Sequence, residues 1–365
     1  MGSLLRPPRL LEAHAAQAEG RLTESALREV EDEAILAALA MQRETGISVV
    51  SDGEYRRSTW AGDFVASVAG YVAGSPPVTL RWRGQVGAPA AAPSTTGGRV
   101  IGERLRQVKR LTGDEAPFLA QHAGGPFKVT MPAPSYIVAR GYKPGVTDKA
   151  YGSRAELMAD VSRIIAAEVK ALVEEGVRYI QLDNPHYPDY IDAGRREEWR
   201  AQGVDPDHAL EEDIEGDNAA LQGFDRAGVT LAMHLCRGNG GQAGWHTEGS
   251  YEPIAEQVFG RIAVDRFLLE YDSDRAGGFE PLRFVPPGKV VVLGLITTKA
   301  GTLESQDELW RRVEEASRYV PLADLALSPQ CGFASVMQGN PLTWDEQRRK
   351  LETVVETARR VWGDA

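Results

Sequence analysis

The chain has 365 residues but very few cysteines, no long apolar run and no concentrated positive charge. Its two cysteines, Cys236 and Cys331, are too few for the disulfide framework of a secreted scaffold. No stretch approaches the roughly 18 uninterrupted apolar residues of a membrane-spanning helix, and the N-terminus has no apolar signal core. We therefore expect a cytoplasmic protein that has no membrane partner and keeps both thiols reduced.

Charge and motif content exclude two further classes. There are 52 acidic and 41 basic residues, giving a net charge of −11, and the basic clusters are short. A surface that follows nucleic-acid phosphates needs a concentrated positive stripe, so no nucleic-acid partner is expected. No Gly-x-Gly-x-x-Gly turn follows an early strand, which removes the main support for a dinucleotide-binding fold. We therefore expect an enzyme that acts on small molecules. The sequence does not indicate an oligomeric state.

Most of the chain alternates between short apolar strands and amphipathic helices, a pattern typical of a parallel α/β sheet. The expected strands begin at Ile47, Phe127, Tyr179, Val229, Arg266, Val290 and Leu325, and the expected helices cover residues 24–43, 155–174, 213–226, 252–259, 306–319 and 344–361. With a further short strand before Arg6, these make eight strand–helix units. The sequence therefore predicts a (β/α)8 TIM barrel formed by residues 1–365 as a single domain.

Residues 67–125 break this alternation, because they are irregular and rich in Gly, Ala and Pro. One alternating run, Val78–Arg83, reads as a strand, with a partner expected near residues 98–104. We predict a hairpin-bearing insertion between the second and third strands. It has too little apolar content to form a core and a domain of its own.

Side chains that bind metals follow three of the expected strands. His234 and Cys236 end one strand, Glu270 ends the next, and Cys331 follows the last. Residues i and i+2 of an extended segment face the same way, and the carboxyl ends of barrel strands meet at one rim. One imidazole, two thiolates and one carboxylate suit Zn²⁺ far better than Mg²⁺ or Ca²⁺. The sequence predicts a zinc site at that rim, against the alternative of a satisfied core histidine and two inert cysteines.

The motifs, taken together, resemble a known family. They are Gly2-Ser3, Asp52-Gly53-Glu54, Val129-Thr130, Ile180-Gln181-Leu182-Asp183, His234-x-Cys236, Glu270 and Pro329-x-Cys331-Gly332. In this order they resemble the C-terminal catalytic domain of cobalamin-independent methionine synthase and the wider zinc-dependent thiol alkyltransferases, which include epoxyalkane:coenzyme M transferase. Position by position, the resemblance implies that His234, Cys236, Glu270 and Cys331 bind zinc, and that Ser3, Glu54 and Asp183 hold the carboxylate and amino ends of homocysteine.

The implied chemistry is methyl transfer from a 5-methyltetrahydrofolate-type donor to homocysteine, giving methionine. Zinc deprotonates a bound thiol and leaves it nucleophilic. Two thiolates and a carboxylate outweigh the charge of the ion, which favours a bound thiolate over activated water. The resemblance further implies that Glu270 gives up its place on the metal to the incoming sulfur.

Two positions depart from the family pattern, both on the donor side. Pro134 stands where the family has an aromatic residue that stacks on the pterin, although Tyr136 or Trp60 offers a substitute. Lys299 stands where the family has a histidine general acid, and a lysine with its usual pKa near ~10.4 is a reluctant proton donor. We assign Lys299 as a general acid or as a contact for an anionic group.

Three functions stay open at this point. The first is methylation of homocysteine, which is supported by Ser3, Glu54 and Asp183. The second is zinc-dependent alkyl transfer from another donor, such as an epoxide, to a different thiol such as coenzyme M, which fits the changed donor side. The third is a zinc-stabilised protein without activity, since four protein ligands can close a structural site.

Overall fold

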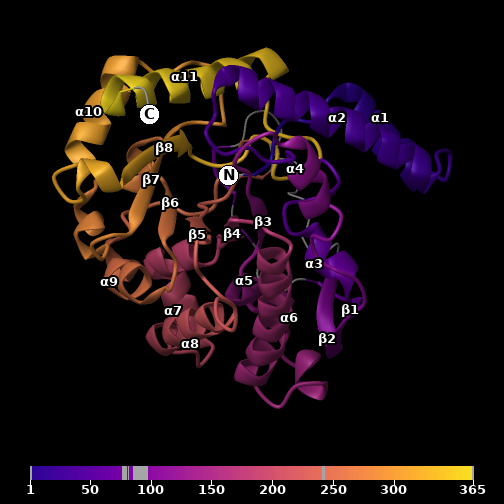
Figure 1. Cartoon of the computed structure of the whole chain (residues 1–365). Coiled ribbons are helices and arrows are strands. Elements are labelled where there is room, and N and C mark those ends of the chain that lie inside the picture. Colours follow the sequence, from indigo (N-terminus) through magenta and orange to yellow (C-terminus); the bar gives the residue numbers. More distant parts are fainter. Residues whose placement is uncertain (1, 76–79, 81, 85–97, 241–242, 364–365) are drawn as a thin grey trace.

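The computed structural model describes residues 2–75, 80, 82–84, 98–240 and 243–363. Its centre is a six-stranded parallel sheet whose strands lie side by side in chain order (Figure 1). These strands are β3 (Val129–Pro132), β4 (Tyr179–Asp183), β5 (Thr230–Leu235), β6 (Arg266–Glu270), β7 (Val290–Ile296) and β8 (Leu325–Pro329). Parallel neighbours that follow one another in the chain place all their carboxyl ends at one edge of the sheet.

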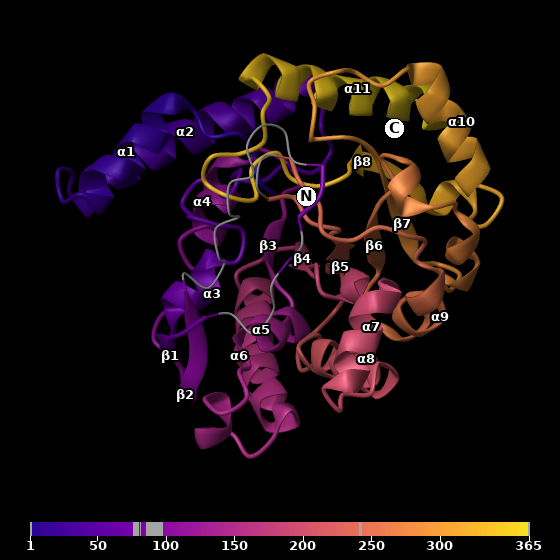
Figure 2. The same ribbon diagram turned by 180° about the vertical axis from the view of Figure 1, so that it is seen from behind.

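Helices lie outside this sheet. They are α1 (Pro8–Ala18), α2 (Glu24–Thr45), α3 (Gly62–Ser67), α4 (Ala116–His122), α5 (Pro134–Gly141), α6 (Arg154–Glu174), α7 (Ala193–Ala201), α8 (Pro206–Ala219), α9 (Glu252–Arg261), α10 (Gln306–Ala316) and α11 (Trp344–Trp362). Seen from behind, α10 and α11 flank β7 and β8 (Figure 2), and α11 also packs against α2. Within the described residues, no helix has both the length and the apolar character needed to span a membrane.

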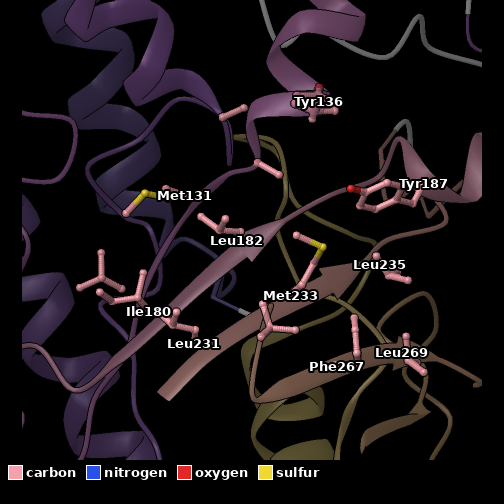
Figure 3. Close-up of a cluster of buried hydrophobic side chains, with 14 of the residues drawn as sticks. Met131, Tyr136, Ile180, Leu182, Tyr187, Leu231, Met233, Leu235, Phe267 and Leu269 are labelled. Atoms are coloured by element: carbon pink, nitrogen blue, oxygen red, sulfur yellow. The ribbon is translucent and has the colours of Figure 1, made fainter. Parts of the chain in front are cut away.

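The two faces of the sheet carry different side chains, because successive residues of a strand point to opposite sides. Figure 3 shows one set packed together, including Ile180, Leu182, Leu231, Met233 and Phe267 from β4, β5 and β6. These alternate positions form the main hydrophobic core beneath the helices. The intervening positions of each strand point to the opposite face of the sheet, away from the helices. The polar residues of these strands lie on that face.

A closed eight-stranded barrel is not confirmed, although the α/β fold with a parallel sheet is. The segment expected to form a strand from Ile47 contributes only one parallel bridge, between Val50 and Phe127. Of the strand expected before Arg6, the described residues 2–5 form no strand, and they are held by single backbone hydrogen bonds, from Leu4 to Gly53 and from Phe333 to Ser3. In the described chain, irregular backbone lies between β8 and β3. Irregular backbone cannot form the continuous series of hydrogen bonds that would pair it with both strands and close the sheet into a barrel.

The hairpin of residues 67–125 is not supported in the form predicted. The observed antiparallel pair is β1 (Val68–Ala73) with β2 (Arg99–Gln107). Half of Val78–Arg83 lies outside the described residues, and Arg83 bridges Trp245 instead. β1 escapes prediction because Gly70 interrupts its alternation: the register shifts between Ala69 and Tyr71, and Gly70 has φ 117°.

The helix predictions are confirmed where the sequence has a capping residue or a strong helical periodicity of apolar residues. Thr23 caps α2, and its hydroxyl accepts a hydrogen bond from the Ala26 backbone N–H. The helix expected over residues 213–226 was wrong in its bounds, because α8 begins at Pro206 behind the capping side chain of Asp205 and ends at Ala219. The Asp-Pro pair is a start signal that outweighs the later apolar period.

Candidate metal centre and substrate site

The structure brings all four predicted zinc ligands together. His234 lies near the end of β5, Cys236 directly after it, Glu270 at the end of β6 and Cys331 just after β8. Their candidate ligand atoms all lie within 4.8 Å of one another. The two Sγ atoms are 3.6 Å apart, close to the ~3.8 Å that separates two sulfurs bound tetrahedrally at about 2.3 Å from a zinc ion.

A glycine on the strand between Glu270 and Cys331 permits this approach. A Cβ on Gly294 of β7 would lie 2.8 Å from the Leu269 carbonyl oxygen and 2.7 Å from the Gln330 Cα. Real side chains do not tolerate such contacts, so glycine lets the Gln330–Cys331 turn fold over β7 towards β6.

Hydrogen bonding inside the group leaves ligand atoms free for a metal. His234 Nδ1 lies 3.2 Å from the Leu268 carbonyl oxygen, so Nδ1 carries the proton and Nε2 is the free lone pair. His234 Nε2 and Glu270 Oε2 are buried without a hydrogen-bond partner, and Nε2 lies 3.9 Å from Glu270 Oε1. Buried polar atoms without partners are rare and need an explanation, and a coordinated ion supplies one here. The residues present therefore fit zinc.

The surroundings favour the ionised form of one ligand, Cys331. The hydrogen bond between the two thiols holds the pKa of Cys331 well below its usual value and raises that of Cys236. Burial raises the pKa of Glu270, and the Arg275 guanidinium, 3.5 Å from Glu270 Oε2, opposes that shift. Cys331 is thus poised as a thiolate, the form that binds metals.

Of the two carboxylates predicted to hold an amino group, Asp183 lies beside this group of ligands, and it is close enough to Glu54 to act on the pKa of that carboxyl. Asp183 ends β4 directly opposite His234 in the β4–β5 register. Glu54 is buried in a left-handed conformation, with φ 58°, and its Oε1 accepts a hydrogen bond of 3.0 Å from Thr130 while Oε2 has no partner. Burial raises the pKa of Glu54 to about 7 and also raises that of Asp183, so a bound cation would stabilise both carboxylates.

Ser3, the third predicted substrate residue, lies against the turn that carries Cys331. Its backbone oxygen accepts from the Phe333 N–H at 2.9 Å, and a Cβ on Gly332 would come 1.9 Å from its hydroxyl oxygen. The hydroxyl is therefore next to the metal ligands, where a thiol substrate would bind.

Lys299 is buried and fully engaged. Its ammonium donates to Gly238 O at 2.9 Å, Asn239 Oδ1 at 3.1 Å and Gly244 O at 3.2 Å, all on the loop after Cys236. Burial lowers its pKa. Lys299 holds this loop in place, so its predicted role as a general acid or anion contact requires one of these hydrogen bonds to be exchanged.

The donor side carries an aromatic pair. The Trp60 and Tyr136 rings contact each other, with centroids 4.6 Å apart. Pro134 begins α5, where a missing N–H costs no hydrogen bond. The two rings named from the sequence as substitutes for the family's stacking residue therefore lie together.

Sequence reasoning gave no role to several residues that support the site. Arg57 binds both Glu115 carboxylate oxygens and the Thr130 carbonyl, and so fixes the residue that contacts Glu54. Asn239 links the loop after Cys236 to the Gly332 carbonyl oxygen at 2.6 Å. These contacts join segments that are far apart in the chain, so no local sequence pattern predicts them.

The comparisons with known proteins agree with this geometry. The family model for the catalytic domain of cobalamin-independent synthase matches residues 1–360. The chain belongs to the cobalamin-independent methionine synthase family. The resemblance seen in the sequence motifs is thereby confirmed. Members of this family are zinc-dependent methyltransferases of the methionine synthase type.

Individual relatives cover nearly the whole chain. Two Bacillus subtilis proteins, YxjG and YxjH, are each 36% identical over 99% of this chain and 93% of their own length, and are named only as uncharacterized proteins. The methionine synthase of Pyrococcus abyssi is 23% identical over 91% of this chain and 85% of its own length.

Solved structures of the family share the fold. A candidate vitamin-B12-independent methionine synthase of Listeria monocytogenes superposes with a TM-score of 0.75 at 28% identity, covering 100% of this chain and 96% of that one. A B12-independent methionine synthase from Shewanella sp. W3-18-1, in complex with selenomethionine, gives 0.73 at 22% identity, with 99% and 96% covered. At 22% identity, the similarity to the Shewanella protein supports a shared fold only.

Proposed function

We propose that this protein is a zinc-dependent methyltransferase that moves a methyl group from a 5-methyltetrahydrofolate-type donor to the sulfur of homocysteine, giving methionine. The observation that carries the proposal is the group His234, Cys236, Glu270 and Cys331, with its unpartnered buried atoms. Ser3, against the Cys331 turn, and Asp183, opposite His234, support an amino-acid thiol as the acceptor together with the buried Glu54.

Zinc bound by the four residues would lower the pKa of the substrate thiol and keep its sulfur nucleophilic at neutral pH. The chain's own residues supply the rest. Glu54 and Asp183 take the α-ammonium, since carboxylates form charge-assisted hydrogen bonds with it, and Glu54 Oε2 is free to do so. Binding in this buried place excludes water and sets the sulfur towards the donor side.

Lys299 fixes Gly238, Asn239 and Gly244, which follow the ligand Cys236 in the chain, through its three hydrogen bonds. Trp60 and Tyr136 offer an aromatic surface for the methyl donor. Alkyl transfer from an epoxide to coenzyme M, the second function open from the sequence, is not favoured by the family and structural relatives.

Turnover with a labelled donor tests the proposal. Zinc-loaded protein incubated with homocysteine and 5-methyltetrahydrofolate carrying a deuterated methyl group is expected to form deuterated methionine, detected by mass spectrometry. Coenzyme M with an epoxide serves as the control and is expected to give no thioether. Alkylated coenzyme M in the absence of any labelled methionine would contradict the proposal.

A further inference from the structure

Arg275 is a mostly buried cation beside the candidate metal centre, and neither the sequence motifs nor the proposed function gives it a role. It lies in the short 3-10 turn Asp274–Ala276 after β6, and its side chain is 10% exposed. Its Nη2 is 2.5 Å from Asp272 Oδ1, and its Nη1 donates to Ser273 Oγ at 2.9 Å. Nη2 also lies 3.5 Å from Glu270 Oε2, which is too long for a strong hydrogen bond. The guanidinium therefore faces the Glu270 carboxylate without bonding to it closely.

The two carboxylate oxygens of Glu270 have different surroundings. Oε1 accepts a hydrogen bond of 3.1 Å from the Arg237 backbone N–H and lies 3.9 Å from His234 Nε2. Oε2 is buried, has no hydrogen-bond partner among the described residues and faces Arg275. The Glu270 backbone is fixed, because its N–H donates to the Tyr251 hydroxyl at 3.2 Å. A small rotation of the side chain can thus bring the carboxylate from the metal ligands to the guanidinium.

The loop after Cys236 keeps Arg275 in this position. The guanidinium lies over the Trp245 ring, 5.2 Å from the ring centroid, and the Arg275 carbonyl oxygen accepts from the Gly249 N–H at 2.8 Å. The Trp245 ring is itself held by a hydrogen bond of 2.6 Å from its Nε1 to Glu248 Oε1. A guanidinium that is packed in this way loses little side-chain freedom when it binds a further carboxylate.

A thiol acceptor needs a position on the metal. The four residues of the candidate centre, one of which is Glu270, fill the four positions of a closed tetrahedral zinc site. We expect an incoming sulfur to replace the single oxygen ligand, because zinc is a borderline-soft ion that favours sulfur and nitrogen. The displaced carboxylate would be a buried negative charge, which is unfavourable unless a cation neutralises it.

We propose that Arg275 is a positioning residue that takes up the Glu270 carboxylate when the acceptor sulfur enters the metal centre. The inference rests on the proposed function and adds the group that makes this ligand exchange favourable. In the exchange, the bond between the metal and the Glu270 oxygen breaks and the bond between the metal and the sulfur forms, while the thiol proton passes to solvent. The carboxylate keeps its negative charge and forms a charge-assisted hydrogen bond with Arg275 Nη2.

Calorimetric titration of zinc-loaded protein with homocysteine tests this role. Arg275→Met removes the charge but keeps an unbranched side chain over Trp245. The variant is expected to bind homocysteine about tenfold or more weakly, because one charge-assisted hydrogen bond is lost. Its zinc content should stay at about one per chain, since Arg275 is not one of the four ligands. Arg275→Lys keeps the charge and should recover much of the affinity.

Removal of Glu270 supplies a readout that a merely structural role would not move. Glu270→Ala, loaded with added zinc, has no carboxylate to displace. Adding Arg275→Met to this variant should therefore change its homocysteine affinity by less than about twofold. Arg283→Met is the matched control, because Arg283 is 45% exposed and pairs with Glu252 away from the metal ligands. It should leave the affinity unchanged with and without Glu270.

An equal loss of affinity from Arg275→Met in the presence and absence of Glu270 would show a structural role and overturn the inference. Loss of zinc from Arg275→Met, or an unchanged homocysteine affinity in that variant, would overturn it as well. If the wild-type protein did not bind homocysteine, the proposed function itself would fail, which is a different outcome from wild-type binding that survives Arg275→Met.

Discussion

Replacing Cys236 or Cys331 with alanine is expected to abolish zinc binding and, with it, methyl transfer. Each substitution removes one of four ligand atoms that lie within 4.8 Å of one another. Loss of even an outer hydrogen-bonding partner costs roughly 10–100-fold in metal affinity, so loss of a thiolate ligand should cost more. Zinc measured by mass spectrometry after gel filtration should fall from about one per chain to near zero.

Two other variants test the assignment of this group. Ser335→Ala removes a hydroxyl 3.9 Å from the Cys331 sulfur and should retain zinc, because the hydroxyl is not one of the four ligands. Glu270→Ala should keep part of the metal, since both thiolates and the imidazole remain. Full zinc occupancy in both cysteine variants would contradict the assignment of this group of residues as the metal centre.

The second large effect is expected at the amino-group site. Wild-type protein should bind homocysteine at least about tenfold more tightly than 4-mercaptobutanoate, which has the thiol and carboxylate but no amine. The reason is that each charge-assisted hydrogen bond contributes about 1.5–3 kcal/mol. Asp183→Asn and Glu54→Gln should each remove most of this difference, measured by calorimetry. Zinc should stay in place in both variants, because neither side chain belongs to the ligand group.

Affinities for the two thiols that are equal in the wild-type protein would rule out an amino-acid acceptor. That result would leave the metal centre intact and redirect the search to thiols without an amino group. A difference that persists in both variants would instead place the ammonium elsewhere in the site.

The metal ligands could be predicted from sequence because their positions follow from strand geometry alone. His234 and Cys236 are two residues apart on one extended segment. Glu270 ends β6 and Cys331 follows β8, two strands of the same parallel sheet whose carboxyl ends share an edge. No knowledge of loop conformation was needed.

The surroundings of Lys299 and Lys128 could not be predicted in the same way. The partners of Lys299 lie more than 50 positions away on a loop whose path depends on Gly238, with φ 103°. Lys128, just before β3, donates a hydrogen bond to Gln181 of the neighbouring strand β4. Such contacts depend on the whole fold.

The closed eight-stranded barrel is not confirmed, for a related physical reason. Ile47–Val50 has the apolar character of a strand, but its neighbour near Ser3 is bent towards the Cys331 turn and the Glu54 loop. Ser51 donates its hydroxyl to the Gly2 carbonyl oxygen at 2.7 Å, so side-chain bonding replaces part of a ladder. Residues that serve the site thus take the place of regular strands.

The central claim is that the thiol of homocysteine joins the metal centre. X-ray absorption at the zinc edge tests it most directly, because sulfur and nitrogen or oxygen neighbours differ in distance, at about 2.3 and 2.0–2.2 Å. The account predicts two sulfur ligands in the resting protein, from Cys236 and Cys331, and three after homocysteine is added. A spectrum that stays at two sulfurs with saturating homocysteine would contradict the account and indicate a closed, structural zinc site.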